Sequence, residues 1–337
     1  MLAPSLRAPI LYLAALLSVK RSRHPPHSPT GRFCAITEHR ARCRSGGERK
    51  MSERPSVIEF RNVWHSYDGE HFVLEDISFS VGPGEMTVIL GGSGSGKSTI
   101  LRLTLGLIRP DEGEIFIHGQ EITSMTEQEL LAVRRKIGIV FQSGALFDSL
   151  SVYENVAYRL REEGWPEERI EEEVRRQLAF IDFKGDVHAL PGELSGGMRR
   201  AVAIARAMVG GPEILLFDEP TAGLDPPTAR ALCELAAKYR DLQGVSSIFV
   251  THRMDDVRFL SSVLYTRDAA GDVLALHRDD ETFSLINTRF LILRNRRIYF
   301  SGTEEQLRRS EDPYVREFIG ALEEMEEQEV FEELRLE

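Results

Sequence analysis

The octapeptide GGSGSGKS, Gly91 to Ser98, has the residue types and the spacing of a loop that wraps around a chain of phosphate groups. It fits the pattern G-x-x-x-x-G-K-S/T, and it lies between the apolar run MTVIL and a helical pattern of apolar residues. Its glycines allow backbone N–H groups to turn toward phosphate oxygens, and the N-terminus of the following helix adds partial positive charge. We expect Lys97 to reach the β- and γ-phosphates of a nucleotide and the Ser98 hydroxyl to bind Mg²⁺. The alternative, a glycine-rich turn with an incidental lysine, does not explain the flanking strand and helix.

Two adjacent carboxylates, Asp218 and Glu219, follow a second apolar run, ILLF. Ligands bind at the carboxyl ends of parallel strands. We therefore expect Asp218 to bind Mg²⁺ through water and Glu219 to act as the general base toward the attacking water. Carboxylates at a strand end can also cap the helix that follows, but a phosphate loop on the same predicted sheet favours the catalytic interpretation.

Two further polar residues end apolar runs of the same kind. Gln142 follows KIGIVF, and His252 follows SSIFVT. Gln142 could orient water and bind the metal, while His252 could contact the γ-phosphate. A lone histidine at a strand end is more often a structural donor, yet four strand ends that carry Lys, Gln, Asp-Glu and His favour one shared site.

The elements that position these residues alternate between strand and helix patterns. VIEFRNVWHSY and VLEDISFSV predict antiparallel edge strands, and the fully apolar MTVIL predicts a buried parallel strand. GEIFIHGQEI predicts a hairpin, and a helix is predicted from Pro227 to Leu242. Strands separated by helices imply an α/β fold with a parallel sheet that is covered on both faces.

The composition is that of an ordinary globular protein of 337 residues, 42% apolar and 28% charged. Residues 1–50 contain ten Lys or Arg against two Glu, which leaves a net charge of about −19 on residues 51–337. Nucleic acid is therefore not an expected partner of the body of the protein. Cys34 and Cys43 lie in the basic leader and only Cys233 is left for the core, so we expect no disulfide there and a reducing, cytoplasmic setting.

The leader, residues 1–50, contains an apolar run from Ala8 to Val19 that is too short to span a membrane. Its basic residues mostly follow that run, which is the wrong order for a secretory signal. We interpret the leader as a non-native or disordered basic extension, with Met51 as the real start. A targeting or anchoring segment is the alternative.

The remaining residues divide into one large domain, 51–320, and a tail, 321–337. Within the domain, two charged amphipathic patterns predict a helical subdomain over residues 143–193. Residues 266–288 are predicted to be an extra polar insert with a short hairpin. The acidic tail is interpreted as a solvated, partly frayed helix rather than a docking helix.

A second glycine pair, Gly196 and Gly197, lies in LSGGM ahead of another helical pattern. With Ser195 it places two glycines at a helix N-terminus, an arrangement that binds anions. The first loop already surrounds one set of phosphates, so this one needs a different phosphate. On these residues alone, an ordinary serine-capped helix explains the pattern as well.

LSGGM between the phosphate loop and ILLFDEPTAGLD resembles the ATP-binding-cassette ATPases, and the resemblance covers Val57 to about Gly302. It implies a P-loop NTPase (RecA-like) fold with a parallel-sheet core, an antiparallel β subdomain and an inserted α-helical subdomain. It also implies that residues 51–320 are the ATPase domain, with the signature motif at the end of the helical subdomain. The implied cofactors are ATP and Mg²⁺.

The resemblance also assigns motifs to particular residues. Leu194 to Met198 matches the signature motif, Gln142 the Q-loop glutamine, Gly223 to Asp225 the D-loop and His252 the switch histidine. In that family two cassettes bind head to tail, and the signature loop of one closes over the γ-phosphate held by the other. The second glycine pair would then serve the ATP of a second copy of this chain.

Two positions near the site carry less certain assignments. Tyr67 matches the aromatic residue that stacks on adenine, with a buried edge-strand tyrosine as the alternative. Arg253 departs from the family, which usually has Asp after the switch histidine. The departure puts the orientation of His252 in doubt rather than the activity.

The expected site residues fall into three sets. Those expected to bind ATP are Tyr67, Gly91, Gly92, Ser93, Gly94, Ser95, Gly96, Lys97, Ser98, Thr99, Gln142, Ser195, Gly196, Gly197, Asp225 and His252. Catalysis is assigned to Glu219, His252, Gln142 and Lys97. The Mg²⁺ ligands are expected to be Ser98, Gln142 and Asp218.

No run of about twenty apolar residues exists, so we expect the chain to act through a membrane partner. Leu146, Phe147 and Leu150, close to Gln142, are the expected docking surface, with local packing as the alternative. FQSGALFDSLSVYENVAY and DPYVREFIG resemble the ATPase of Mla/Mce-type phospholipid transporters.

That resemblance implies a homodimer under an integral membrane permease, at the cytoplasmic face of the inner membrane as a peripheral subunit. It further implies an Mce-domain lipid-binding protein and, in some members, a STAS-domain protein as partners. Two alternatives stay open. One is the ATPase of a transporter for amino acids, metals or drugs; the other is a soluble cassette protein that acts on DNA or the ribosome.

Overall fold

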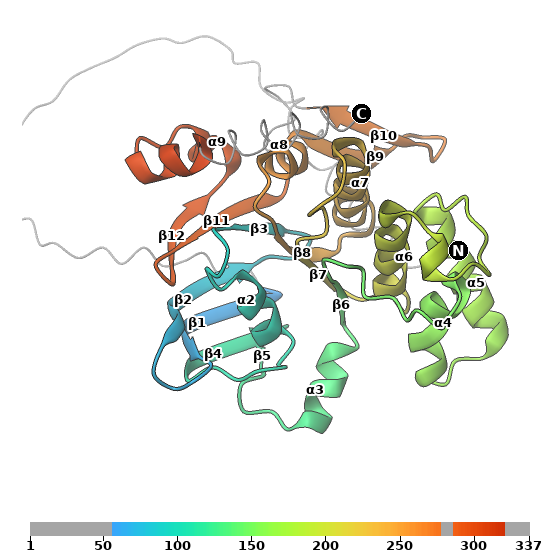
Figure 1. Cartoon of the computed structure of the whole chain (residues 1–337), viewed down its shortest axis with the longest axis horizontal. Helices are drawn as coiled ribbons and strands as arrows, with labels where there is room; N and C mark the ends of the chain where they lie inside the picture. The colour runs from blue at the N-terminus through green and yellow to red at the C-terminus, as the bar shows by residue number, and fades with distance from the viewer. Residues whose placement is uncertain (1–55, 278–285, 321–337) are drawn as a thin grey trace, which may run out of the picture. The chain divides into compact units, whose positions relative to one another are not determined.

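The computed structural model describes residues 56–277 and 286–320, all within the unit Arg54–Glu337 (Figure 1). Its strands are β1 (Ile58–Ser66), β2 (Phe72–Val81), β3 (Met86–Leu90), β4 (Glu112–Ile117), β5 (Gln120–Glu121), β6 (Ile137–Val140), β7 (Ile214–Asp218), β8 (Ser246–Val250), β9 (Val263–Arg267), β10 (Val273–His277), β11 (Thr288–Arg294) and β12 (Arg297–Gly302). Its helices are α2 (Lys97–Thr104), α3 (Glu127–Arg134), α4 (Val152–Glu162), α5 (Glu167–Phe180), α6 (Gly196–Met208), α7 (Pro226–Gln243), α8 (Met254–Ser262) and α9 (Glu304–Arg308), with a 3-10 turn η2 (Pro191–Glu193). The interpretations of the leader and of the acidic tail concern residues outside those described.

A six-stranded sheet with the order β12-β11-β3-β8-β7-β6 forms the centre, and all of its neighbouring strands are parallel except β12. Every residue of β3 and β8 is buried. Strands buried on both faces read as continuous apolar runs rather than alternating ones. The parallel α/β core predicted from MTVIL, ILLF and SSIFV is confirmed.

Alternate side chains of the parallel strands enter two separate hydrophobic cores. Leu215 and Phe217 pack in the core that contains α6, α7 and α8. Ile214 and Leu216 pack in the core that contains α2 and the antiparallel sheet. Figure 1 shows these two layers on opposite faces of the central sheet. The sheet is therefore covered on both faces, as predicted.

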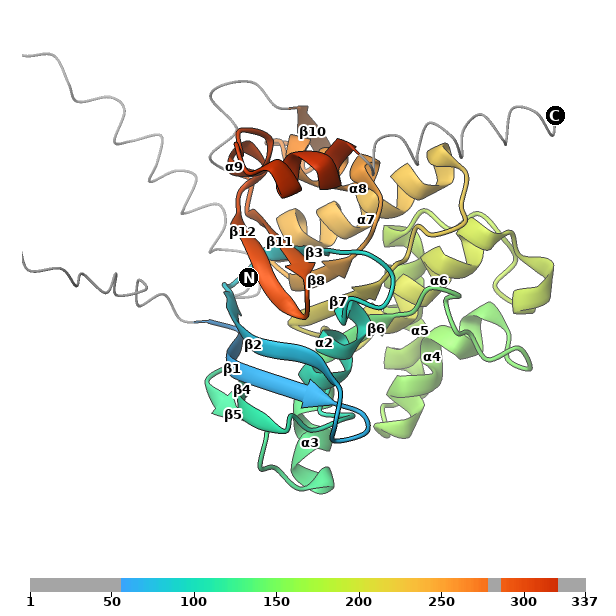
Figure 2. The same cartoon turned by 60° about the vertical axis from the view of Figure 1, so that its left-hand side comes forward.

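The antiparallel sheet has the order β2-β1-β4-β5, and it lies beside α2 in Figure 2. The prediction from the sequence that β1 is an edge strand is wrong. β1 pairs with β2 on one side and with β4 on the other, for example Phe60 opposite Phe79 and Ile115. Because β4 lies about fifty residues further along the chain, the local pattern of β1 could not reveal its second neighbour.

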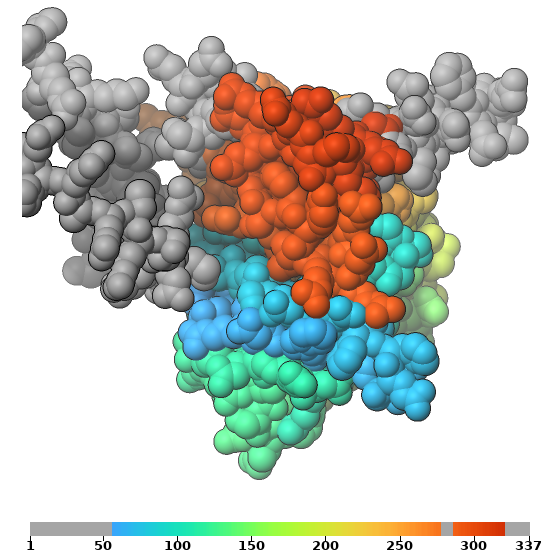
Figure 3. Space-filling model, turned by 90° about the vertical axis from the view of Figure 1, so that its left-hand side faces the viewer, coloured from blue at the N-terminus to red at the C-terminus, as the bar shows by residue number. Residues whose placement is uncertain are grey.

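The end of the described chain returns to the first strands. The backbone N–H of Glu75 on β2 donates to the Arg296 carbonyl over 2.8 Å, and Arg296 Nη1 lies 2.9 Å from the Glu75 carboxylate. In Figure 3 the orange and red C-terminal segment accordingly borders the blue N-terminal strands, which are visible directly below it. This contact fixes one side of the antiparallel sheet against the central sheet.

The predicted helices between residues 143 and 193 are present as α4 and α5. Ser151 caps α4 in a capping box with Glu154. Three shorter helices, α3, α8 and α9, were missed. Thr126 and Glu129 form a capping box at α3, so the sequence did carry a signal for that helix.

The hairpin predicted within residues 266–288 is present as β9 and β10, but its first strand begins at Val263. All five residues of β10 are exposed. Residues 278–285 of the predicted insert lie outside those described. Within the described residues no helix combines the length and apolar character that crossing a membrane requires.

Candidate functional site

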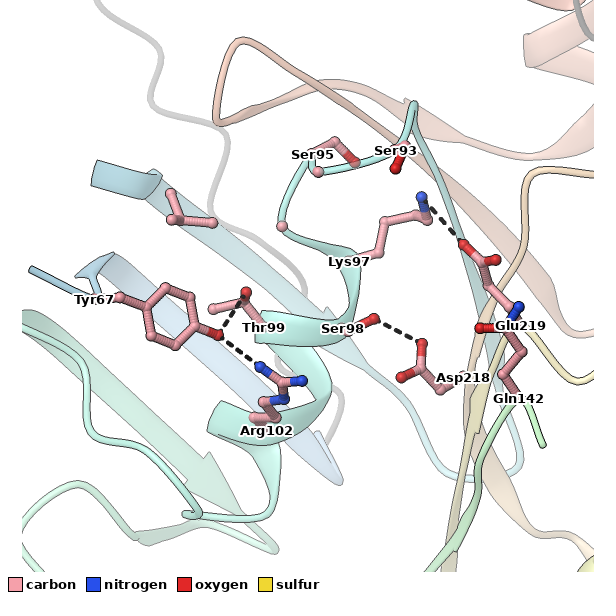
Figure 4. Close-up of a pocket in the computed structure, with 13 residues that line it drawn as sticks. Tyr67, Ser93, Ser95, Lys97, Ser98, Thr99, Arg102, Gln142, Asp218 and Glu219 are labelled. Carbon is pink, nitrogen blue, oxygen red and sulfur yellow. Dashed lines mark hydrogen bonds and ion pairs between the residues drawn. The ribbon is translucent and has the colours of Figure 1, made fainter. Parts of the chain in front are cut away.

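A cavity of about 470 Å³ lies at the carboxyl end of the parallel strands, beside the loop between β3 and α2 (Figure 4). Its volume suits a bound nucleotide. The residues that line it are Tyr67, Val73, Ser93, Gly94, Ser95, Gly96, Lys97, Ser98, Thr99, Arg102, Gln142, Asp218 and Glu219. Lys97, Gln142, Asp218 and Glu219, expected from three strand ends to share a site, are thus brought together. His252, from the fourth strand end, does not line the cavity itself but contacts Glu219.

The phosphate loop is held open by backbone conformations that favour glycine. Gly96 has φ +98°, and a Cβ there would lie 2.5 Å from the Leu74 side chain. The buried Lys97 Nζ donates to the carbonyls of Gly91 (2.8 Å) and Gly92 (3.1 Å). The lysine therefore lies across the loop, with its positive charge directed at the place where phosphates would bind.

Oxygen atoms of two residues meet where a divalent cation is expected. The Ser98 hydroxyl donates to the Asp218 carboxylate over 2.8 Å, and Gln142 lines the same cavity. Burial raises the pKa of the Asp218 carboxyl. Mg²⁺ is usually bound by one or two protein oxygens together with phosphates and water, so this donor set fits the ion.

Glu219 lies between a lysine and a histidine. Its carboxylate is 3.4 Å from Lys97 Nζ and 3.3 Å from His252 Nδ1. The hydrogen bond with His252 and the charge of Lys97 hold the pKa of Glu219 below its usual range. Glu219 also has φ +47°, a strained value for a non-glycine residue that is common at functional sites. The residue is thereby kept ionised, as a general base must be.

Tyr67 follows β1 at the opposite side of the cavity, with 55% of the residue exposed. The expectation of a buried edge-strand tyrosine is therefore wrong. Its hydroxyl lies 3.1 Å from the Thr99 hydroxyl and accepts from Arg102 Nη1 over 3.1 Å. The bonded hydroxyl fixes the ring while leaving it accessible for stacking on a flat ligand.

Comparison with known proteins agrees with this geometry. The sequence model of the ABC transporter family matches residues 74–222. The intermembrane phospholipid transport ATP-binding protein MlaF of Escherichia coli is 34% identical over 268 residues, which cover 79% of this chain and 90% of MlaF. The chain belongs to the ATP-binding-cassette ATPases.

Other relatives are named for the transport of other substrates. The methionine import ATP-binding protein MetN of Symbiobacterium thermophilum is 40% identical over 205 residues, which cover 60% of this chain and 62% of MetN. The chain therefore spans less than two thirds of the length of that relative. A dimeric structure of the cassette MJ0796 bound to ADP and Pi matches with a TM-score of 0.60 and 29% identity, over 73% of this chain and 98% of that one.

The signature and D-loop residues lie away from the cavity of their own cassette. The Ser195 hydroxyl accepts from the N–H of Met198 and caps α6, with Gly196 and Gly197 in its first turn. Asp225 caps α7, where its carboxylate accepts from the N–H and the hydroxyl of Thr228. None of Ser195, Gly196, Gly197 or Asp225 lines the cavity. Their expected contacts with ATP remain predictions that require a second copy.

Gly197 also has a role within its own chain. A Cβ at this position would lie 2.3 Å from the Thr228 methyl group on α7. The glycine therefore allows α6 to approach α7 closely, whatever it contacts in a partner. This packing could not be read from the sequence, because Thr228 is thirty-one residues away.

A buried polar cluster adjoins His252 in the chain and was not predicted from the sequence. The Asp256 carboxylate accepts from the hydroxyls of Thr221 (2.6 Å) and Thr251 (2.5 Å) and from the Cys233 thiol (3.3 Å). Burial raises the pKa of Asp256. The cluster joins the segment after Glu219 to the end of β8, directly before His252. A threonine directly before the switch histidine was the only sequence signal for it.

Arg253, the departure from the family, is buried behind the site. Its backbone N–H donates to the Thr251 hydroxyl over 3.1 Å, and its Nη1 donates to the Leu224 carbonyl over 3.4 Å. The side chain therefore reaches the loop before Asp225. His252 nevertheless contacts Glu219, so the presence of Arg253 in place of Asp does not prevent this contact.

We expect Gly197→Ala to destabilise the protein by about 1–3 kcal/mol, because the new methyl group overpacks the contact with Thr228. Adding Thr228→Ser removes the clashing methyl group and keeps the hydroxyl bonded to Asp225. Urea denaturation of both variants should show recovery of stability in the double variant. A double variant as unstable as Gly197→Ala would contradict the packing explanation. If ATPase activity stays lost after stability recovers, Gly197 has a second role.

We expect His252→Ala to raise the pKa of Glu219, since the variant lacks the hydrogen bond that stabilises the carboxylate. The pKa can be followed by carbon-detected NMR of nucleotide-free protein labelled at glutamate carboxyls. Glu219→Gln identifies the resonance by its disappearance. An unchanged titration in His252→Ala would show that Lys97 alone sets this pKa.

Proposed function

We propose that this cassette binds ATP with Mg²⁺ in the cavity and hydrolyses it as one of two copies arranged head to tail. The observation that carries the proposal is the gathering of Lys97, Ser98, Asp218 and Glu219 around one cavity, with His252 in contact with Glu219. Lys97 neutralises charge on the β- and γ-phosphates, and Glu219 accepts the proton of the attacking water. His252 keeps Glu219 ionised and oriented. Bound Mg²⁺ would supply charge stabilisation between Ser98 and Asp218.

The head-to-tail arrangement is supported by the location of the signature residues. Gly196 and Gly197 begin a thirteen-residue helix whose N-terminus is suited to an anion, yet neither residue lines the cavity of its own chain. The related cassette MJ0796 is described as dimeric with ADP and Pi bound. ATP would favour the closed dimer and hydrolysis would favour reopening, which shifts the population between two states.

The closing motion would move an integral membrane permease. Phe147 is 44% exposed and its ring lies 4.7 Å from that of Tyr158, which is also exposed. Leu146 and Leu150 are partly buried, and Leu146 packs against the helical core, so local packing explains part of the expected docking surface. Phe147 and Tyr158 are the residues that we propose for contact with the permease.

We propose phospholipid as the substrate class, with the protein at the cytoplasmic face of the inner membrane as a peripheral subunit. The match covers 90% of MlaF but 62% of MetN, and this difference favours the lipid assignment. An Mce-domain lipid-binding protein and a STAS-domain protein are the further partners proposed. The higher identity to MetN, 40%, keeps methionine import as the second candidate.

We expect Glu219→Gln to lower ATP turnover by at least about 10²-fold, because the amide cannot accept a proton from water. The variant should still bind ATP and should accumulate as a closed dimer. Steady-state phosphate release and size-exclusion chromatography with and without Mg-ATP measure the two effects. A variant with wild-type turnover would overturn the assignment of Glu219 as the base.

We expect the tagged protein to recover a multi-span permease, an Mce-domain protein and phospholipid from detergent-solubilised membranes of its host. Mass spectrometry identifies the proteins, and thin-layer chromatography identifies the lipid. Phe147→Ser is the matched control, since it should bind ATP normally and lose the permease. Recovery of an amino-acid permease would replace the phospholipid assignment and leave the ATP site unchanged.

A further inference from the structure

Arg200, in the second turn of the signature helix α6, bonds two loops at once. Its Nε donates to the carbonyl of Gln142 over 2.7 Å, and its Nη2 donates to the carbonyl of Ala222 over 2.6 Å. Gln142 lies in the loop after β6, and Ala222 lies in the loop after β7. One side chain thus joins three segments that are far apart in the sequence.

Each of the three segments carries a different part of the nucleotide machinery. Gln142 lines the cavity of its own chain. Ala222 lies midway between Glu219, which also lines that cavity, and Asp225, which caps α7. The N-terminus of α6 carries Gly196 and Gly197, which in the proposed dimer face the ATP of the other copy. Arg200 therefore connects the element that would sense the partner's nucleotide to the loops that contact its own.

The chemistry of the contact requires arginine in particular. A guanidinium holds several N–H donors in one rigid plane, so it can bond two carbonyls in fixed directions, whereas a lysine ammonium acts as a single flexible charge. Within the described residues Arg200 forms no ion pair with a carboxylate, and burial lowers its pKa. Burial of the guanidinium costs hydration free energy, which its bonds to the two carbonyls offset.

A second arginine of α6, Arg206, bonds one loop, whereas Arg200 bonds two. Arg206 donates to the carbonyls of Gly144 (3.0 Å) and Ala145 (2.7 Å), further along the loop that begins at Gln142. In the part of the chain that the structure describes, Arg206 forms no hydrogen bond with the loop after β7. The loop after β6 is therefore bonded to α6 at three carbonyls, and Arg200 adds the link to the segment between Glu219 and Asp225.

We propose that Arg200 is a positioning residue that couples the two nucleotide sites of the dimer. When α6 moves to close over the partner's ATP, Arg200 moves the Gln142 and Ala222 carbonyls with it and so aligns Gln142 and Glu219 at its own site. The two ATP molecules are then hydrolysed cooperatively. This inference rests on the proposed head-to-tail dimer.

The test compares Arg200→Gln and Arg200→Lys with wild type in the full chain, and Arg175→Gln serves as a control. Arg175 is an exposed arginine on α5 that pairs with Glu171 one turn away. The measurements are the affinity for a fluorescent ATP analogue with Mg²⁺, kcat, the Hill coefficient for ATP, and the melting temperature. All rates are measured well below the melting temperature of each variant.

We expect both Arg200 variants to keep the affinity of wild type, because Arg200 does not line the cavity. Their kcat should fall by about tenfold or more, since small misplacements of catalytic groups are costly. The Hill coefficient should fall from a value approaching two toward one. The Arg175→Gln control should retain the wild-type values of all four quantities.

Three results would overturn the inference, and only the last of them would also overturn the proposed dimer. If Arg200→Gln keeps the wild-type kcat and Hill coefficient while Glu219→Gln forms a dimer, Arg200 does not couple the two sites. The proposed dimer would then still stand. Full recovery in Arg200→Lys would show that the charge matters and the two-carbonyl geometry does not. If Glu219→Gln binds ATP but remains monomeric, the proposed dimer is wrong and the inference is lost with it.

Discussion

Parallel pairing of β3, β8 and β7 sets where each residue of the nucleotide site can lie. Asp218 at the end of β7 is in register with Val250 at the end of β8, and the N–H of Thr251 donates to Ile89 near the end of β3. Because the three strands run in one direction, their carboxyl ends meet at one edge of the sheet. Ser98 and Asp218, which are 120 residues apart in the sequence, can therefore form a hydrogen bond of 2.8 Å.

Two adjacent carboxylates at this edge have opposite shifts in pKa. Burial raises the pKa of Asp218, while His252 and Lys97 lower that of Glu219. Successive side chains of a strand point to opposite faces of the sheet. The positive φ of Glu219 also turns the backbone away from the direction of β7. The two groups are thereby given different surroundings, which is how neighbouring carboxyls come to serve different roles.

The helix α6 connects the signature glycines to the loops beside the cavity. Its first turn carries the signature glycines, while Arg200 and Arg206 on later turns bond the loop that begins at Gln142. Gly197 brings this helix close to α7 at Thr228. Since α6 is bonded to both loops and packed closely on α7, it is expected to move with them rather than independently of them.

The sequence by itself determined the family, the residues that meet at the site and most of the elements that hold them. The phosphate loop, the strand ends at Gln142, Asp218 and His252, and the two helices after residue 143 could be predicted. Each of these depends on residues that are near one another in the chain, through a glycine pattern, an apolar run or a helical period. The family relationship followed from the same local motifs.

Only the tertiary structure decided how distant segments meet. The central position of β1 depends on β4, the cluster around Asp256 depends on hydroxyls from two separate loops, and the bonds of Arg200 depend on two carbonyls. Backbone carbonyls carry no sequence signature, since every residue has one. The hydrogen-bond partners of Arg200 therefore could not be predicted from the sequence, although Arg200 itself lies two residues after the signature motif.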